Sequence, residues 1–539
     1  MDRPAPGKER SGWRDAAAGW SLGVLAFVAV SWRFGYGYAS GDQDEVLPLL
    51  LHTLDPAVLA NDWFVGTQTA DFSVRTYFVR MLWLLAQVMP VWMVILAVDV
   101  LCFGVLGHVL YRIGQRMYGA DARGRLGAAL GTFAALALTY KWTLGSNDLV
   151  YAMLVPEMAA WPLALYAGLR ISEIGIYSGV EEAPRGRLVG LAVLLGVAAW
   201  FQVLVALQVG VLTGCALLVG AWQARKSGYQ ALVPVVLFVA VFGIASLPAS
   251  VPLFVQQVGS AGVEAEPDVF YLIGPFRNPF HHMPFSFSVG SYAKFGLVTV
   301  LGLAAAVVMQ RSGRLRMPGV LWAWLGVIAV ALGIGTVFTE FVPVLLVAKL
   351  QLFKLTVVAK ALFVLLIGGG LASLISVRWA TWVDARSVVP VLVLGTGLLL
   401  VGSFVLVAAN WEPAVSRVGP LVHQTTDLGR MEAWIQQETA PDAVFAVPPA
   451  TSTFRSTAQR GAVVTYASYP YKDSYMQDWY RRMLAIAPID PPRRGMGLKP
   501  VLDAAYHTQT AEDWRRLAPE YGIDYVLTRD HQLAMPLVH

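Results

Sequence analysis

Charged side chains are scarce in this chain. Asp, Glu, Lys and Arg make up 14% of the 539 residues, whereas 56% are apolar and the mean hydropathy is +0.57. Soluble domains typically carry about 25% charged residues. This deficit excludes a water-soluble globular protein for most of the chain, because long apolar helices without a polar face need a bilayer as their solvent.

Cysteine is also rare. Cys102 and Cys215 both lie in apolar runs, without a CxxC spacing or a histidine nearby. We expect two buried thiols that form neither a disulfide nor a metal site. The C-terminal part has no glycine-rich phosphate-binding motif, which argues against nucleotide binding there. The net charge of +5 is not a nucleic-acid signal, because the basic residues lie in short loops between apolar runs.

Apolar runs of the length that crosses a bilayer dominate the sequence. The first, from about Ala18 to Val30, follows a polar, basic start and has no small-residue cleavage site, so it reads as a membrane helix and not as a leader. Spanning helices need roughly 20 mostly apolar residues. Eleven segments meet or approach this length, near 18–35, 90–111, 126–143, 158–170, 188–201, 203–222, 231–248, 292–310, 318–338, 353–376 and 388–409.

The loops between these segments alternate in charge. Cytoplasmic loops are enriched in Lys and Arg. One set of six loops is basic, with Arg112, Arg116, Arg170, Arg187 and Arg225 among its members, and the other set holds most of the acids. We therefore expect a multi-pass protein of the cell inner (plasma) membrane. Its residues 1–17 would be cytoplasmic, its membrane domain would cover 18–410, and its C-terminal domain would be extracytoplasmic.

Two long segments fall on the expected outer side, at about 31–79 and 249–291. The first contains Val46–Leu54, which is too short to cross and fits a helix along the membrane surface. From about residue 421 to 539 the composition becomes mixed. Strand candidates at Val444–Val447, Ala462–Tyr466 and Ile523–Thr528 alternate with helical patterns there, which predicts a small α/β domain with a mainly parallel sheet.

Three carboxylates lie within four residues after the first span, namely Asp42, Asp44 and Glu45. Such a cluster near a membrane surface suits a general base or a cation site. The spacing from Asp42 to Glu45 before an apolar run equally suits a capping box for the helix Val46–Leu54.

Further along the same loop, Asp55 before Pro56 predicts a capped helix start. Asp62 either caps a turn or faces the site. Trp63 and Phe64, which follow it, are expected to anchor at the lipid headgroups.

Basic and imidazole side chains occur in the later outer segments. Arg277, His281 and His282 suit binding of phosphate or sugar oxygens, although they equally suit a solvated loop. Lys354 opens a late span, where it could bind a phosphate or snorkel to the headgroups. Lys360 and Asp99 lie deeper in apolar runs, where a charge is costly and tends to be functional or paired.

With these motifs the chain resembles the GT-C superfamily of integral-membrane glycosyltransferases, and most closely its uncharacterised bacterial members with a C-terminal soluble domain. The likeness rests on the acidic loop with Asp42, Asp44 and Glu45 and on its continuation Leu54-Asp55-Pro56 and Asn61–Phe64. It rests also on Arg277 with the His281–His282 pair, on Gln351–Lys354, and more loosely on Trp434, Phe454-Arg455, Arg460 and Trp479.

The resemblance implies a sugar transfer from a polyprenyl-phosphate carrier with inversion at the anomeric carbon. Asp44 or Glu45 would be the base, supported by Asp42 and Asp62. Arg277, His281, His282 and Lys354 would bind phosphate and sugar. No cofactor is required, although a divalent cation is compatible with the acids, and the partners would be the lipid-linked donor and membrane lipids.

Two other readings remain open. One is a non-catalytic protein of the same fold that binds carbohydrate or lipid. The other is a transporter, which internal repeats and charges at mid-depth would favour. The sequence shows no convincing repeat, and its polar candidates lie mainly in the expected outer loops.

Overall fold

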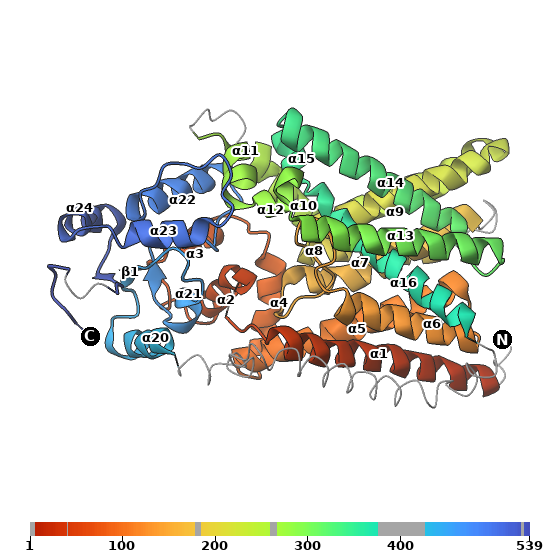
Figure 1. The fold of residues 1–539 in the computed structure, drawn as a ribbon, viewed down its shortest axis with the longest axis horizontal. Coiled ribbons are helices and arrows are strands. Elements are labelled where there is room, and N and C mark those ends of the chain that lie inside the picture. The colour runs from red at the N-terminus through yellow and green to blue at the C-terminus, as the bar shows by residue number, and fades with distance from the viewer. Residues whose placement is uncertain are drawn as a thin grey trace. The chain divides into compact units, whose positions relative to one another are not determined.

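A computed structural model describes residues 6–39, 41–177, 185–258, 267–375, 426–529 and 533–538, with side chains from residue 13 onward (Figure 1). The chain divides into two compact units. Unit 1 comprises Met1–Gly35, Leu96–Ala249 and Phe280–Ala414, and unit 2 comprises Tyr36–Ile95, Ser250–Pro279 and Val415–His539. Each unit is therefore built from segments that lie far apart in the sequence.

Unit 1 is a bundle of helices. Its members, three of which (α5, α10 and α12) include residues of unit 2, are α1 (Pro6–Phe34), α5 (Val91–Tyr118), α6 (Ala122–Phe133), α7 (Pro156–Tyr177), α8 (Arg185–Phe201), α9 (Val203–Gln223), α10 (Val233–Val258), α12 (Pro279–His282), α13 (Val289–Arg311), α14 (Pro318–Thr336), α15 (Leu345–Lys349) and α16 (Thr356–Leu374). Short π and 3-10 turns extend several of them, namely η2 (Ala134–Leu138), η3 (Arg225–Leu232), η5 (Pro284–Ser286), η6 (Val337–Phe341) and η7 (Leu352–Leu355).

Helices coincide with ten of the eleven predicted spans, and the eleventh, near 388–409, lies outside the described residues. Seven helical stretches of the described chain are long and apolar enough to cross a membrane: Trp13–Phe34, Val91–Tyr118, Val203–Gln223, Arg225–Gln256, Val289–Arg311, Pro318–Phe341 and Leu345–Leu374. The chain is thus a largely helical protein with several membrane-spanning helices. The predicted total of eleven spans and their orientation stay predictions.

Glycine allows a close contact between the helices α6 and α16 in unit 1. On α6, Gly127 and Gly131 form a small-xxx-small pair that meets Gly368 of α16. A Cβ atom on Gly368 would lie 2.5 Å from the Gly127 carbonyl oxygen and 2.6 Å from the Gly131 nitrogen. Small residues let backbones approach in membranes, where packing replaces the hydrophobic effect as the main source of association.

Unit 2 combines the acidic loop, a second loop segment and the C-terminal segment. The first part contains η1 (Gly41–Glu45), α2 (Leu47–Leu54), α3 (Trp63–Ala70) and α4 (Thr76–Ala86). The second contains α11 (Val269–Tyr271) and η4 (Leu272–Arg277). The C-terminal segment, shown in blue in Figure 1, contains α20 (Asp427–Glu438), β1 (Val444–Ala446), α21 (Phe454–Thr457), β2 (Gly461–Ala462), α22 (Asp473–Ile486), α23 (Leu498–Tyr506), α24 (Ala511–Tyr521) and β3 (Tyr525–Val526).

The predicted parallel sheet is confirmed, with the strand order β2-β1-β3. Phe445 of β1 is in register with Ala462 on one side and with Tyr525 on the other. Its ring joins Ile435, Val447 and Phe454 in a buried core. Thr426 caps α20 by accepting a hydrogen bond from the Gly429 N–H.

Two local predictions are wrong. Asp42 and Glu45 do not cap α2; they lie in η1, and Val46 precedes α2 without a side-chain cap. Asp55 follows the end of α2 and accepts from the Ala57 N–H in a turn, because Pro56 continues into a turn and not into a helix. The segment Val46–Leu54 does form a helix, α2, with Leu47, Leu49 and Leu50 buried, and its position along the membrane surface stays a prediction.

The aromatic pair after Asp62 also lies elsewhere than expected. Phe64 is buried beneath the guanidinium of Arg455, and Trp63 stacks against Arg482. Both rings therefore bind the C-terminal segment within unit 2 and are not free to anchor in headgroups. The predicted strand Ala462–Tyr466 is shorter than expected, since β2 comprises only Gly461–Ala462, followed by one further bond from the Val463 N–H to the Phe445 carbonyl oxygen.

Substitution of Gly368 by Ala tests the glycine contact. We expect a loss of about 2 kcal/mol or more in stability, because the added methyl overlaps backbone atoms that cannot move aside. Thermal unfolding in detergent measures it. Gly326→Ala on α14 is the matched control, since nothing lies within 4 Å of its Cβ position. Equal melting temperatures for both variants would contradict the contact.

Candidate functional site

The acidic loop of unit 2 meets a buried arginine of the C-terminal segment. Arg455 donates from its Nε atom to Asp62 Oδ2 at 2.7 Å, and its Nη1 atom lies 3.8 Å from Asp44 Oδ2. All three side chains are fully buried. A buried charge is tolerated only when paired and hydrogen-bonded, so this guanidinium compensates two carboxylates at once.

Asp62 is fully satisfied in this arrangement. Its carboxylate caps α3 by accepting from the Val65 N–H and also accepts from the Ala462 N–H beside β2. Of the two alternatives raised by the sequence, the cap is confirmed, and a role of Asp62 in a functional site stays a prediction. Asp62 joins the acidic loop to the sheet of the C-terminal segment.

Asp44 is less well satisfied. Its Oδ2 atom accepts from the hydroxyls of Thr465 at 3.0 Å and Ser468 at 2.5 Å, while its buried Oδ1 atom has no hydrogen-bond partner among the described residues. Burial raises the pKa of Asp44 to about 6, although the positive charge of Arg455 opposes the rise. The Asp44 carboxyl therefore stays protonated and neutral up to a higher pH than the carboxyl of an ordinary aspartate.

Glu45 has its own arginine. Arg75 donates to Glu45 Oε2 from Nη2 at 2.7 Å and from Nε at 3.2 Å, and the Tyr471 hydroxyl donates to the same oxygen at 3.2 Å. Burial raises the pKa of Glu45, and Arg75 acts against that rise. Arg75 and Tyr471 come from the start of α4 and from the C-terminal segment, which again joins two distant stretches of the chain.

Arg277 lies between two aromatic rings of the C-terminal segment. Its guanidinium carbon is 4.6 Å from the ring centre of Tyr466 and 5.1 Å from that of Tyr469. It donates to the Ala467 carbonyl oxygen at 2.8 Å and to Asn278 Oδ1 at 2.9 Å. Cation–π contacts of this kind fix a charge in place without neutralising it.

Asp42 is the exposed member of the three clustered carboxylates in the loop. Its carboxylate and the guanidinium of Arg277 both act on the pKa of Glu45, in opposite directions. Both also act on Lys499, an exposed residue of α23 whose pKa is lowered by burial first and by Arg277 second. Asp42, Glu45, Arg277 and Lys499 therefore form one mixed-charge cluster in unit 2, which we call the acidic-loop site.

Lys354 belongs to unit 1, where its ammonium donates to Glu157 Oε2 at 2.6 Å. Both side chains are buried. Lys354 therefore does not extend to solvent, and its charge is balanced within the bundle. Lys360 forms a second buried ion pair with Asp148 and also donates to the carbonyl oxygens of Ala135 and Thr139. Asp99 is buried, and neither of its oxygens has a hydrogen-bond partner among the described residues.

The two histidines also lie in unit 1. His281 places its Nδ1 atom 2.5 Å from the Gly145 carbonyl oxygen. His282 is almost fully buried, and this burial lowers its pKa to about 3, so its ring is neutral at ordinary pH. His282 therefore offers no cation to an anionic ligand in this arrangement.

The structure thus brings together five of the eight candidates from the sequence, namely Asp42, Asp44, Glu45, Asp62 and Arg277, all in unit 2. His281, His282 and Lys354 belong to unit 1, so a common pocket for all eight stays a prediction. The partners Arg75, Tyr471, Ser468 and Lys499 were not foreseen. Arg455 was noted in the sequence only as part of a loose likeness, and no local pattern pointed to its pairing with Asp44 and Asp62.

Within the ranges that the structure describes, no three His, Cys, Asp or Glu side chains converge as metal ligands do. Asp44 and Asp62 share Arg455 as their counter-charge instead. Of the three clustered carboxylates, Asp42 is the one that could contact a cation from solvent.

Comparisons with known proteins add little. A domain family of unknown function, DUF6798, matches residues 426–486, which is a small part of the chain. The comparison with curated proteins gave no match. Among solved structures, the chain is similar to the archaeal oligosaccharyltransferase AglB from Archaeoglobus fulgidus in complex with an inhibitory peptide and a dolichol-phosphate. The identity is 12%, the TM-score is 0.41, and the match covers 96% of this chain and 69% of that one.

Asp44→Asn tests the buried carboxyl. The pKa of Asp44 is higher in the folded state, about 6, than its ordinary value of 3.8. Ionisation of Asp44 therefore costs stability as the pH rises through this window, by roughly 3 kcal/mol at most. We expect the variant to melt like the wild type near pH 4 and to become relatively more stable by pH 7.

Asp62→Asn is the contrasting variant, because it removes the closest counter-charge of buried Arg455. It should lose about 3–5 kcal/mol. Melting curves of both variants from pH 4 to pH 7 provide the measurement. A stability difference between Asp44→Asn and wild type that does not change with pH would contradict the environment described for Asp44.

Proposed function

We propose that this chain is a GT-C-type membrane glycosyltransferase that moves a sugar from a polyprenyl-phosphate-linked donor to an extracytoplasmic acceptor, with inversion at the anomeric carbon. The observation that carries the proposal is the acidic-loop site. There an exposed carboxylate, Asp42, lies in one electrostatic cluster with two cations from distant segments, Arg277 and Lys499. The sequence resemblance to GT-C enzymes supplies the reaction class.

In this proposal Asp42 is the base that meets the acceptor. It takes the proton of the acceptor hydroxyl as the oxygen attacks the anomeric carbon, while the bond from that carbon to the phosphate oxygen breaks. The electron pair leaves with the polyprenyl phosphate. Positioned carboxylates accelerate such proton transfers by roughly 10²–10⁴-fold, and exposure is what allows Asp42 to reach an acceptor.

The two cations, Lys499 and Arg277, have different roles in the proposed reaction. Lys499 is exposed and can contact the leaving phosphate directly. Arg277 is held by Tyr466, Tyr469 and the Ala467 carbonyl, so it contributes fixed positive charge that needs no reorganisation during the reaction. Asp44 and Glu45, favoured by the resemblance as bases, are buried against Arg455 and Arg75. Here they position the loop that carries Asp42.

One observation favours the alternative, a non-catalytic protein of the same fold that binds carbohydrate or lipid. Both acids that the resemblance would make the base are hydrogen-bonded inside unit 2, Asp44 to Ser468 and Glu45 to Arg75. A binding protein needs only the exposed part of the cluster. Catalysis by Asp42 is what separates the two functions.

Transfer in proteoliposomes from a panel of polyprenyl-phosphate sugars tests the proposal. Asp42→Asn should reduce kcat by at least about 100-fold, since the amide cannot take a proton. Lys499→Gln should mainly raise the KM for the donor. Asp55→Asn is the matched control, because Asp55 is an exposed acid of the same loop whose carboxylate accepts only from a turn N–H.

Full activity of Asp42→Asn would refute the role of Asp42. If the wild type bound a polyprenyl-phosphate sugar but transferred it to no acceptor, the non-catalytic alternative would replace the proposal.

A further inference from the structure

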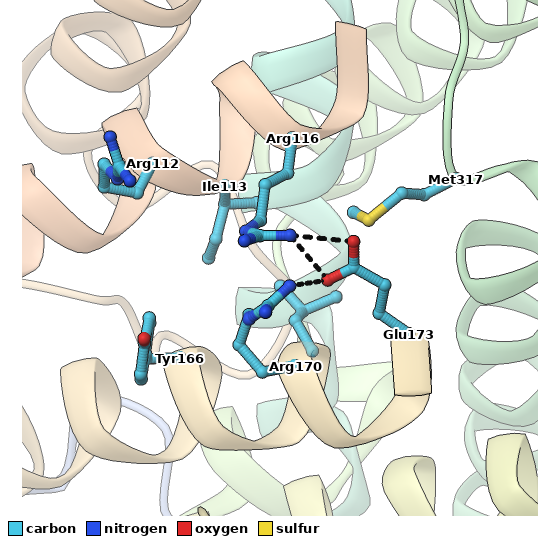
Figure 2. A pocket seen from close by; sticks show the side chains of 8 residues that line it. Arg112, Ile113, Arg116, Tyr166, Arg170, Glu173 and Met317 are labelled. Atoms are coloured by element: carbon cyan, nitrogen blue, oxygen red, sulfur yellow. Dashed lines mark hydrogen bonds and ion pairs between the residues drawn. The ribbon is translucent and has the colours of Figure 1, made fainter. Parts of the chain in front are cut away.

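A pocket lined by arginines lies in unit 1 (Figure 2), whereas the acidic-loop site belongs to unit 2. Arg112 and Arg116 of α5 reach it from one side, and Tyr166 and Arg170 of α7 from the other. Its enclosed space is about 40 Å³. That is room for roughly three water-sized groups, which matches the oxygens of one phosphate group.

Part of this positive charge is balanced within the pocket. Glu173 accepts two hydrogen bonds of 2.8 Å from Arg116 and pairs also with Arg170, as the dashed lines in Figure 2 show. One carboxylate thus serves two guanidinium groups. The shared carboxylate orients both arginines, and the group of two guanidinium groups and one carboxylate keeps a net positive charge.

Arg170 carries unused binding capacity. Its side chain is 8% exposed, yet its buried Nε atom has no hydrogen-bond partner among the described residues. A buried guanidinium N–H without an acceptor costs stability. An anionic oxygen in the pocket would satisfy it, because arginine presents several N–H groups in a planar fork suited to phosphate.

Arg112 and Arg187 add to the same field. Arg112 lies 3.7 Å from Asp15 and is nearly half exposed, so its charge is weakly balanced. Arg187 at the start of α8 acts electrostatically on Arg170 from outside the pocket. Among the described groups named here, cations outnumber carboxylates, and a cleft lined by one sign of charge concentrates ions of the opposite sign.

The rest of the lining is apolar, from Ile113, Leu169 and Met317. Water-exposed anion sites do not need such a lining, whereas a glycerol backbone and the first methylenes of an acyl chain would contact it. Basic pockets between membrane helices on the cytoplasmic side are sites of this kind. The charge alternation of the loops predicts the cytoplasmic side for Arg112, Arg116, Arg170 and Arg187.

We propose that the pocket between α5 and α7 binds a phosphate group, held by Arg112, Arg116 and Arg170, and that an anionic phospholipid supplies it. The site is independent of sugar transfer. Glu173 keeps the arginines in place when the pocket is empty, and the phosphate takes up the free donors of Arg170 and Arg112.

The full-length protein in detergent provides the test. Phosphatidic acid, phosphatidylglycerol, phosphatidylcholine and inorganic phosphate are each added, and bound lipid is counted by native mass spectrometry while thermal stability is followed in parallel. We expect the two anionic lipids to be retained and to raise the melting temperature, and phosphatidylcholine to have little effect.

Arg112→Gln should weaken retention of the anionic lipids roughly tenfold, as expected for loss of one charge-assisted contact. This variant keeps the buried ion pairs and should fold normally. The double variant Arg170→Gln/Glu173→Gln removes a cation and its acid together, so no buried charge is left alone, and it should lose retention further. Arg225→Gln is the control, an exposed arginine of another basic loop that stacks on Trp222.

Stabilisation by inorganic phosphate alone, lost in the same variants, would support the phosphate site but assign it to a free anion. The proposal is overturned if no phosphate source changes the stability of the wild type. It is equally overturned if Arg112→Gln and the double variant bind the lipids as Arg225→Gln does.

Discussion

The structure of unit 2 depends on one buried cation, the guanidinium of Arg455. It compensates Asp62 and Asp44, which come from a stretch almost 400 positions earlier in the chain, and it also donates to Thr465 and the Ala462 carbonyl. Removing Arg455 or Asp62, which form the closest pair of this network, leaves an uncompensated buried charge, which is far more costly than the net value of the pair. The acidic loop and the C-terminal sheet are therefore stable only together. The ion pair of Arg75 with Glu45 also holds the acidic loop in place. The contacts of Arg277 with two aromatic rings connect the second loop segment with the C-terminal segment.

This dependence connects the fold with the proposed chemistry. Asp44 and Glu45 form the buried contacts that hold the loop in place, whereas Asp42, between Gly41 and Gln43, remains exposed on the loop. The backbone around Asp42 is fixed further by Gln43, whose side-chain oxygen accepts from the Ala39 N–H. An exposed carboxylate on a rigid support, near cations that other segments hold in place, is the arrangement that acid–base catalysis at a membrane enzyme requires. Of these three acids, Asp44 and Glu45 therefore stabilise the loop, and Asp42 is available for the proposed chemistry.

Much of the fold followed from hydropathy and local signals, because a bilayer-spanning helix and a capped helix are both local features. The long helices of unit 1 and the strands β1 and β3 lie where the sequence predicts them. The site was less predictable because its partners are non-local. Nothing near Asp44 or Asp62 points to Arg455, and nothing near Lys354 or Lys360 identifies Glu157 or Asp148. The spacing from Asp42 to Glu45 fits a capping box in the sequence. In the structure, however, Asp42 is exposed to solvent and Glu45 pairs with Arg75.

The joint between the acidic loop and the C-terminal segment is tested most directly by hydrogen–deuterium exchange on Arg455→Met, a variant that keeps the side chain's bulk and removes its charge. The account predicts faster exchange in peptides covering residues 41–71 and 443–468, with unchanged exchange in α6 and α16 of unit 1. Exchange in both regions of unit 2 identical to that of the wild type would show that the buried guanidinium does not hold them together, and would contradict the account.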